Sequence, residues 1–306
     1  MRIVFMGTPD FAVASLDALL KAGFDVVGVI TAPDKPAGRG QKIHQSAVKQ
    51  YAESHNLYTL QPEKLKDKAF LKELETLKAD LQVVVAFRML PEVVWNMPSK
   101  GTINLHASLL PQYRGAAPIN WAIINGEEES GVTTFFLKQE IDTGDILFCE
   151  KVSISDNMIA GELHDELMNI GAGLLTKTVT AIKEGNYKEL PQDSFDDTVL
   201  KHAPKIFKDD CKINWEEPLE RVYNHIRGLS PYPAAFTTFL GKTLKLFRAE
   251  KEAEYHETPA GDFISDGKTF LKFATPDGYI SLKEIQLEGK KRMRIDEFLR
   301  GIKISS

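Results

Sequence analysis

The chain has 306 residues, of which 43% are apolar, 26% charged and 9% aromatic, as in an ordinary soluble globular protein. This length favours two domains, each large enough to have its own core. Cys149 and Cys211 are far apart in the sequence, which argues against a disulfide framework or a zinc knuckle. The N-terminal stretch MRIVFMGTPDF lacks the apolar run of a signal peptide, and no later segment has the length of a membrane helix. We therefore expect a cytoplasmic chain with no membrane segment.

The net charge of −5 is unevenly distributed along the chain. Residues 201–306 carry 19 Lys and Arg against 16 Asp and Glu, a net charge of +3, so residues 1–200 carry −8. A less acidic C-terminal part is compatible with a polyanionic partner such as a nucleic acid. Solvated surface alone gives the same imbalance, so charge leaves both interpretations open.

Short β-branched runs alternate with helical patterns in the N-terminal part. Strands are predicted over 2–7, 25–31, 81–87 and 101–106, and helices over 11–23 and 46–55. This alternation predicts an α/β fold with a Rossmann-like, mostly parallel sheet covered by helices on both faces. Two further strands, over 131–138 and 144–154, extend the sheet antiparallel and are joined by the loop around Asp142. A long amphipathic helix follows, begun by Ser155 or Asp156 and ended by Gly185.

The pattern changes after this helix. Residues 186–210 are polar and nearly aperiodic, as in an interdomain linker. Beyond them a helix over 218–229 precedes five short strands, over 234–240, 242–250, 261–266, 269–275 and 278–289, which predict a small OB-like β-barrel. We therefore place an N-terminal domain at 1–188, a linker at 189–207 and a C-terminal domain at 208–306.

Two glycine-containing stretches follow the first two predicted strands. The first strand ends in GTPDF, without the G-x-G-x-x-G pattern of a dinucleotide site, which disfavours a nicotinamide or flavin enzyme. The second is followed by DKPAGRGQK, residues 34–42, with three basic side chains. Such a loop is either flexible surface or part of a ligand site, because ligands of open α/β sheets bind at this edge.

The stretch NLHASLLPQYRG, residues 104–115, carries the strongest chemical pattern. Alternation along a strand places Asn104 and His106 on the same side, and the EIDTGDI turn could bring Asp142 to His106. A carboxylate beside an imidazole favours the charged ring and fixes its tautomer. These three residues suit a site that stabilises an oxyanion and moves a proton while two substrates react directly. A buried structural histidine is the alternative.

Ser108 allows a second enzymatic interpretation. It is the one hydroxyl nearby that could form a Ser-His-Asp hydrolase with His106 and Asp142. The stretch has no G-x-S-x-G elbow, so this interpretation is the weaker one.

Several motifs together resemble the formyltransferase family that uses 10-formyltetrahydrofolate. They are GTPDF, PDKPAGRG, NLHASLLPQYRGAAPINWAI and GVTTFFLKQEIDTGDIL. The stretches KINW and IRGLSPYPAAFTTF resemble the second domain of the members that act on initiator methionyl-tRNA. The resemblance therefore covers the chain from Met1 through the C-terminal domain.

The resemblance implies a catalytic set of Asn104, His106 and Asp142, with 10-formyltetrahydrofolate as co-substrate and no metal. The folate would lie against the SLLP residues and the loop after the strand at 81–87, that is, Ser108, Leu109, Leu110, Pro111, Phe87, Arg88, Met89 and Leu90. Family members usually have a Tyr-Gly-like step in that loop, whereas this chain reads AFRMLP. The role of Arg88 is unexplained, and it could simply point to solvent.

The resemblance also implies a monomer that binds initiator methionyl-tRNA and formylates the α-amino group of its methionine. The expected tRNA-contacting cations are Arg39, Lys42, Lys201, Lys205, Lys208, Lys242, Lys245 and Arg248. Contacts between such cations and phosphates give affinity without sequence information. Two alternatives remain, a formyltransferase for an amino-sugar nucleotide or another small amine, and a non-enzymatic nucleic-acid-binding protein.

Overall fold

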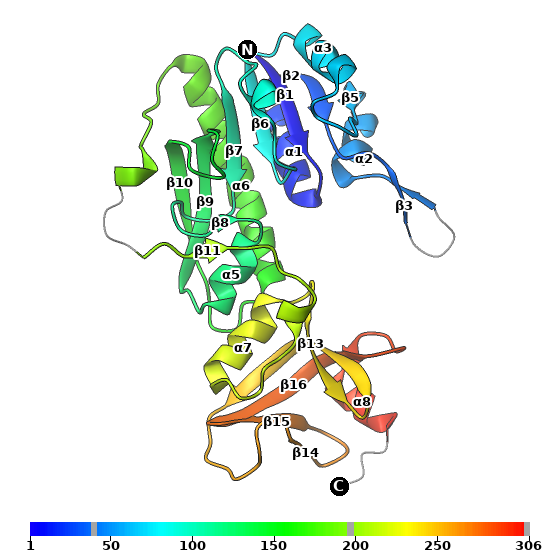
Figure 1. Cartoon of the computed structure of the whole chain (residues 1–306). Coiled ribbons are helices and arrows are strands. Elements are labelled where there is room, and N and C mark those ends of the chain that lie inside the picture. Colours follow the sequence, from blue (N-terminus) through cyan, green and yellow to red (C-terminus); the bar gives the residue numbers. More distant parts are fainter. Residues whose placement is uncertain (38–41, 195–198, 303–306) are drawn as a thin grey trace. The chain divides into compact units, whose positions relative to one another are not determined.

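A computed structural model describes residues 1–37, 42–194 and 199–302 (Figure 1). The chain forms two compact units, each assembled from segments that are not contiguous in sequence. Unit 1 comprises Met1–Gly115, Gly131–Val152 and His164–Lys201, and unit 2 comprises Ala116–Ser130, Ser153–Leu163 and His202–Ser306. The domain boundaries expected from composition, at 188 and 208, stay a prediction.

Unit 1 is built on a seven-stranded sheet in the order β10-β9-β7-β6-β1-β2-β5. Strands β1, β2, β5, β6 and β7 run parallel, and β9 is antiparallel to β7. The strands are β1 (Arg2–Gly7), β2 (Asp25–Ile30), β5 (Thr59–Leu60), β6 (Leu81–Val85), β7 (Thr102–His106), β9 (Glu129–Phe136) and β10 (Ile146–Ser153). The chain reverses its direction of travel across the sheet between β1 and β6, which makes this a topological switch point of the kind that binds ligands.

Helices cover both faces of the central strands. On one face Val4 and Met6 of β1 pack with Phe70 and Leu74 of α3. The alternate residue Phe5 is also fully buried, as expected for a parallel strand between two layers. The helices of this part are α1 (Asp10–Lys21), α2 (Ala47–Ser54), α3 (Lys68–Thr76), α4 (Glu92–Trp95) and most of α6 (Ala160–Glu184).

The long helix α6 packs against β7 and β9. A Cβ added at Gly171 would lie 2.9 Å from a methyl group of Leu105, and the Thr178 and Thr134 hydroxyls are hydrogen-bonded at 2.8 Å. The helix begins at Ala160, not directly after Ser155 or Asp156 as the sequence suggested. Glu162 instead accepts a hydrogen bond from the Ile159 N–H at 3.0 Å, which satisfies one of the free donors at the helix start.

The basic loop after β2 is flanked by two short strands that the sequence pattern did not predict. They are β3 (Lys35–Ala37) and β4 (Lys42–His44), which pair antiparallel. The short strands β8 (Arg114–Gly115) and β11 (His202–Ala203) were also not predicted.

Unit 2 is built on an antiparallel sheet in the order β12-β13-β16-β15-β14, with β17 paired to β16. Its strands are β12 (Ala235–Phe239), β13 (Lys242–Glu252), β14 (Phe263–Ser265), β15 (Leu271–Thr275), β16 (Gly278–Leu287) and β17 (Met293–Arg294), and its helices are α5 (Pro118–Ile124), α7 (Leu219–Gly228) and α8 (Ile295–Arg300). A mostly parallel α/β sheet followed by an antiparallel half-barrel confirms the predicted fold class. Among the described residues, no helix is both long and apolar enough to cross a membrane.

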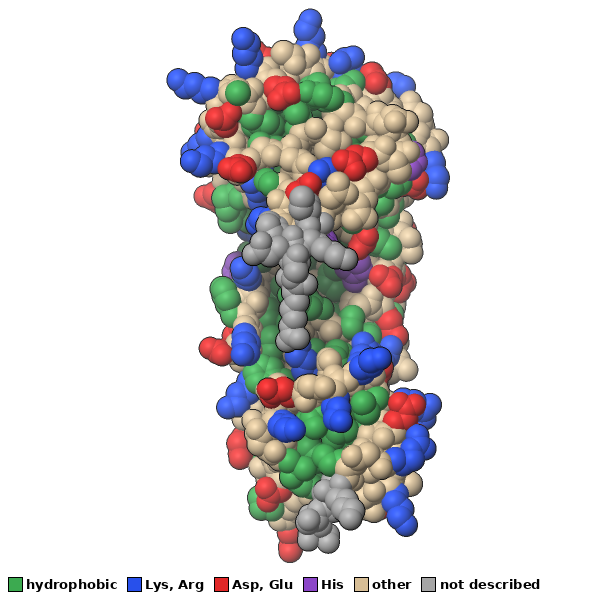
Figure 2. All heavy atoms as spheres, turned by 90° about the vertical axis from the view of Figure 1, so that its right-hand side faces the viewer, with side chains coloured by type: hydrophobic (Ala, Val, Ile, Leu, Met, Phe, Trp, Pro, Cys, Tyr) green, Lys and Arg blue, Asp and Glu red, His purple; other side chains and the backbone are tan. Residues whose placement is uncertain are grey.

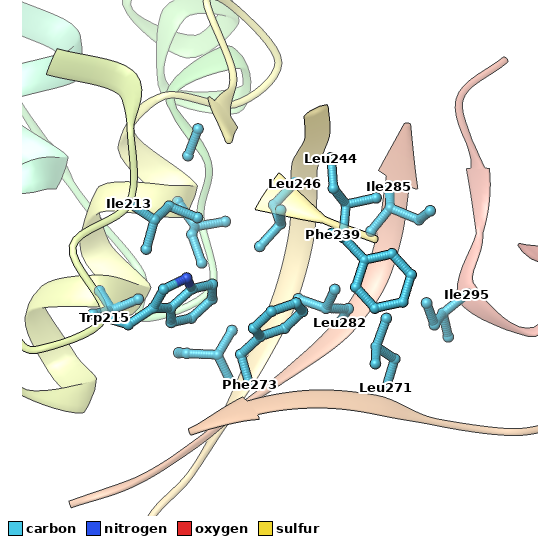
Figure 3. Packing of buried hydrophobic residues seen from close by; sticks show 14 of the residues in the cluster. Ile213, Trp215, Phe239, Leu244, Leu246, Leu271, Phe273, Leu282, Ile285 and Ile295 are labelled. Atoms are coloured by element: carbon cyan, nitrogen blue, oxygen red, sulfur yellow. The ribbon is translucent and has the colours of Figure 1, made fainter. Parts of the chain in front are cut away.

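Several aromatic rings lie within the mostly aliphatic core of unit 2 (Figure 3). The Phe239 ring contacts the rings of Phe263, Phe273 and Phe298, with centroids 5.0, 6.2 and 6.1 Å apart. Trp215 stacks on Phe273 at 4.7 Å and donates a hydrogen bond from its indole N–H to the Thr237 hydroxyl at 2.9 Å. Trp215 therefore joins the segment before α7 to the sheet.

We expect Phe239→Ala to lower the free energy of unfolding of unit 2 by about 3–5 kcal/mol, because it removes a fully buried ring and leaves a cavity. Thr238→Ala, at the exposed neighbouring position of β12, is the matched control and should change it far less. Urea denaturation followed by tryptophan fluorescence measures both. Equal losses in the two variants would contradict the placement of Phe239 at the centre of this core.

Candidate active site

Strand β7 carries two of the three predicted catalytic side chains. Asn104 pairs with Val84 of β6 on one side and Phe135 of β9 on the other, and His106 lies at the carboxyl end of the strand. Because side chains alternate along a strand, both project to one face, while Leu105 between them faces α6. In the described part of the chain, no partner is found for the Asn104 amide, which leaves it available to a ligand.

The His106 ring is held in one orientation by a backbone carbonyl. Its Nε2 donates to the Tyr113 carbonyl oxygen at 2.9 Å, and its side chain is only 7% exposed. Tyr113 has φ of +59°, an uncommon conformation for a bulky residue, and its own N–H donates to the Lys201 carbonyl at 2.7 Å. Since a carbonyl can only accept, Nε2 carries a hydrogen and Nδ1 is the nitrogen left for chemistry.

Asp142 faces that second nitrogen. One of its oxygens, Oδ2, lies 3.8 Å from His106 Nδ1 and accepts a hydrogen bond from the Gly115 N–H at 3.0 Å. Asp142 has φ of +55°, which Asp tolerates better than most residues. Two residues later, a Cβ at Gly144 would lie 1.5 Å from the Phe136 carbonyl oxygen, so only glycine fits. The structure thus brings together the histidine and the carboxylate that the sequence separated by 36 positions.

The SLLP turn is held by its own hydrogen bonds. Ser108 donates from its hydroxyl to the Gln112 carbonyl at 2.6 Å. Thr133 accepts from the Leu110 N–H at 3.2 Å and donates to the Ser108 carbonyl at 2.7 Å. Both nitrogens of His106 face other groups, so the Ser108 hydroxyl is not placed as a nucleophile, and the hydrolase interpretation loses its basis.

The side chains of this turn mostly point inward. Leu110 is 5% exposed and packs with Phe135 and Ile146, Pro111 is buried, and a Cβ at Gly131 would lie 2.5 Å from a Leu109 methyl group. A ligand contact from Leu110 would therefore use its backbone. The assignment of these residues to a folate site stays a prediction.

The loop after β6 is anchored by Arg88, which does not point freely to solvent. Its guanidinium donates to the Glu63 carbonyl at 2.9 Å and to the Pro62 carbonyl, and it lies over the Phe87 ring at 5.4 Å. Burial lowers the pKa of Arg88, and its Nε has no partner among the described atoms. Met89 is 71% exposed, whereas Leu90 is buried in the core of unit 1. Arg88 therefore fixes the loop to the segment at 62–63.

The predicted tRNA-contacting cations fall into three groups. Arg39 lies outside the described residues, and of Lys42 only the backbone is described. Lys201, Lys205, Lys208, Lys242 and Lys245 are exposed, and Lys205 lies 5.4 Å from the Phe207 ring centroid. On the face shown in Figure 2, Lys and Arg side chains are interspersed with Asp and Glu.

Arg248 has a charged partner within unit 2. It donates to both carboxylate oxygens of Glu162 and, at 3.5 Å, to the Asn157 carbonyl. Burial raises the pKa of Glu162, but hydrogen bonds from Arg248 and the Ile159 N–H outweigh this and hold the pKa below its ordinary value. The charge of Arg248 is therefore largely compensated.

Gln192 is a buried polar residue at the site that the sequence pattern did not indicate. It lies in the polar segment assigned to the linker, yet it is 4% exposed and hydrogen-bonds to Arg114 and to the Asp142 loop. Nothing in that aperiodic stretch distinguishes Gln192 from its polar neighbours. Within the described residues, no group of three His, Cys, Asp or Glu side chains could hold a metal ion.

Comparison with known proteins finds a family match for each part of the chain. Residues 1–179 match the family described as Formyl transferase, and residues 205–303 match the one described as Formyl transferase, C-terminal domain. Two similar relatives, each named methionyl-tRNA formyltransferase, come from Bacteroides fragilis, at 55% identity over all of this chain and 96% of the relative, and from Flavobacterium johnsoniae, at 53% over all of this chain and 97% of the relative.

Solved structures share the fold at much lower identity. An N-formyltransferase from Helicobacter canadensis, in complex with folinic acid and dTDP-3-aminofucose, has a TM-score of 0.67 at 21% identity and covers 95% of this chain and 99% of its own. HypX from Aquifex aeolicus, in complex with tetrahydrofolic acid, has a TM-score of 0.66 at 19% identity and covers 99% of this chain and 48% of its own. With both family matches in place, the chain belongs to the formyl transferase family.

Proposed function

We propose that this chain transfers the formyl group of 10-formyltetrahydrofolate to the α-amino group of methionine on initiator methionyl-tRNA, giving N-formylmethionyl-tRNA. The observation that carries the proposal is the pair formed by His106 Nδ1 and Asp142 Oδ2, 3.8 Å apart. Asn104 lies on the same strand as His106, and its amide has no partner among the described residues. The full-length similarity to methionyl-tRNA formyltransferases supports the choice of acceptor.

The reaction is the attack of an amine on a formyl carbon. The folate co-substrate supplies the formyl group on a nitrogen that can leave. The amine must be neutral to attack, and an α-amino group with a pKa near ~8 is partly neutral at cellular pH. The protein therefore has to bind both substrates, stabilise negative charge on the formyl oxygen and transfer one proton.

Asn104 is suited to stabilise the negative charge that develops on the formyl oxygen. Its amide N–H donates to the formyl oxygen as negative charge develops there, and it does so from a strand fixed on both sides by β6 and β9. One donor of this kind contributes roughly 3 kcal/mol to lowering a barrier.

His106 and Asp142 are suited to transfer the proton that the attacking amine loses. Nε2 is committed to the Tyr113 carbonyl, so Nδ1 handles the proton lost by the amine. Asp142 stabilises the charged ring, and the 3.8 Å gap between the two leaves room for a substrate atom or a water between them. Proton transfer from the amine toward the departing folate nitrogen then needs no covalent enzyme intermediate.

The remaining parts of the proposal concern binding. We assign the folate to the loop at 87–90 and the turn at 108–111, the catalytic domain to 1–188, the linker to 189–207 and tRNA binding to 208–306. Lys205, Lys208, Lys242 and Lys245 supply phosphate contacts, since each is exposed and none has an ion pair within the described residues. The enzyme acts in the cytoplasm as a monomer.

The acceptor is tested directly by a formyl-transfer assay with 10-formyltetrahydrofolate and three acceptors, methionyl-tRNA, free methionine and an amino-sugar nucleotide. We expect transfer to methionyl-tRNA only. The amino-sugar nucleotide is included because a solved structure of the same fold is described with dTDP-3-aminofucose. Transfer to that acceptor instead would keep the catalytic set and refute the tRNA assignment.

Asp142→Asn tests the proton role with little disturbance of the loop. The amide oxygen can still accept from the Gly115 N–H, but the negative charge beside His106 is lost. We expect kcat to fall about a hundredfold or more with an unchanged melting temperature. Asp145→Asn, in the same loop and paired with Lys138 at 2.8 Å, is the control and should stay within about twofold. Full activity of Asp142→Asn would exclude this role.

The double variant Lys242→Gln/Lys245→Gln tests the cations of β13. If each contacts one phosphate, the Kd for methionyl-tRNA rises and the slope of log Kd against log salt falls by roughly 0.9 per lost contact. Lys251→Gln is the control from the same strand, because Lys251 is paired with Glu220 at 2.6 Å. An unchanged salt slope in the double variant would remove β13 from the tRNA-binding surface.

A further inference from the structure

Gln192 uses all of its hydrogen-bonding capacity inside unit 1. Its Nε2 donates to the carbonyl oxygens of Asp142 and Gly144, both at 2.8 Å. Its Oε1 accepts from Arg114 Nε at 2.9 Å and Nη2 at 2.6 Å. Both donor hydrogens and both lone pairs of the Gln192 amide are thus satisfied. The residue is only 4% exposed.

These four bonds hold both sides of the Asp142 carboxylate. On one side they fix the backbone of the loop at Asp142 and Gly144. On the other they fix Arg114, whose neighbour Gly115 donates its N–H to Asp142 Oδ2. Asp142 has a positive φ, which is maintained only where the surroundings determine the backbone. Gln192 therefore holds the Asp142 carboxylate in place in two ways. It fixes the backbone of the Asp142 loop, and through Arg114 it fixes the Gly115 N–H that donates to the carboxylate.

The same stretch of chain also contacts the support of His106. The Lys201 carbonyl accepts from the Tyr113 N–H at 2.7 Å, and the Lys201 N–H donates to Gln112 Oε1 at 2.8 Å. Tyr113 in turn provides the carbonyl that orients His106 Nε2. The described ends of the segment, 192–194 and 199–201, thus contact the supports of both members of the His106–Asp142 pair.

We infer that Gln192 is a positioning residue for the reaction, and that it sets the distance and direction of the Asp142 carboxylate relative to His106 Nδ1. The inference rests on the function proposed above. It assigns part of the active site to a segment that composition alone describes as a linker.

An amide is the side chain that fits this position. A carboxylate of the same size would accept from Arg114 but would place its second oxygen against two carbonyl oxygens. An apolar side chain would leave the Asp142 and Gly144 carbonyls and the Arg114 guanidinium without a partner. Gln192→Glu therefore keeps the volume and the Arg114 contact, and replaces the two hydrogen bonds to the Asp142 loop with contacts between oxygens.

The test measures kcat and KM for both substrates, together with the melting temperature, in Gln192→Glu and Gln192→Met. We expect kcat to fall tenfold or more while both KM values change less than about threefold. Gln82→Met is the matched control, because Gln82 is also a buried amide of unit 1, at 1% exposure, and accepts from the Thr102 hydroxyl at the amino end of β7, the end away from His106. This control should lower the melting temperature and keep kcat.

A double-variant comparison separates positioning from stability. If Gln192 acts through Asp142, then adding Gln192→Glu to Asp142→Asn should lower kcat little further, because the group being positioned is already inactive. Multiplied losses in the double variant, or full kcat in Gln192→Glu, would overturn the inference. The wild-type protein is assayed alongside with each acceptor. If it formylates a small amine and not methionyl-tRNA, the proposed function fails, and the same comparison on that amine still decides the role of Gln192.

Discussion

The hydrogen bond from His106 Nε2 to the Tyr113 carbonyl oxygen is the interaction on which the site depends. Because the carbonyl can only accept, Nε2 must donate to it, and the other ring nitrogen, Nδ1, faces Asp142. The carbonyl must itself be fixed for this to work, and Tyr113 is held at a positive φ by its bond to the Lys201 carbonyl. The turn at 108–113, which leads to this carbonyl, is itself held by hydrogen bonds of Ser108 and Thr133.

The antiparallel end of the sheet explains how Asp142 reaches this histidine. Strand β9 runs opposite to β7 and ends with Phe136 beside Ile103, at the amino end of β7. The loop at 137–145 must therefore fold back over the face from which Asn104 and His106 project. Gly144 allows this return because the Phe136 carbonyl oxygen occupies the space of a side chain. The connection that follows the antiparallel strand β9 therefore carries the carboxylate to His106.

The sequence pattern predicted most of the longer strands and the face of each strand on which a residue lies. The longer parallel strands β1, β2, β6 and β7, the placement of Asn104 and His106 on one face, and the main strands of the C-terminal sheet follow from periodicity. The short strands β3, β4 and β5 do not. The network around Gln192 does not, because its partners lie 48, 50 and 78 positions away and are ordinary backbone carbonyls or an arginine. Arg88 is a similar case, since its anchor is a pair of carbonyls in a loop before α3. Hydrogen bonds to main-chain atoms leave no residue pattern for the sequence to display.

The distribution of charge partners separates two kinds of cation in unit 2. Arg248 is paired with Glu162, which also accepts a hydrogen bond from the Ile159 N–H. This arginine therefore stabilises the start of α6 and does not present an uncompensated charge. Lys242 and Lys245 belong to the same strand but are exposed without such partners in the described chain. A cation without a partner attracts a polyanion, and the affinity that it adds falls as the salt concentration rises. A paired cation adds little to the affinity or to its salt dependence. Net charge per residue range is therefore a weaker guide to a tRNA surface than the pairing of each cation, which only the folded chain displays.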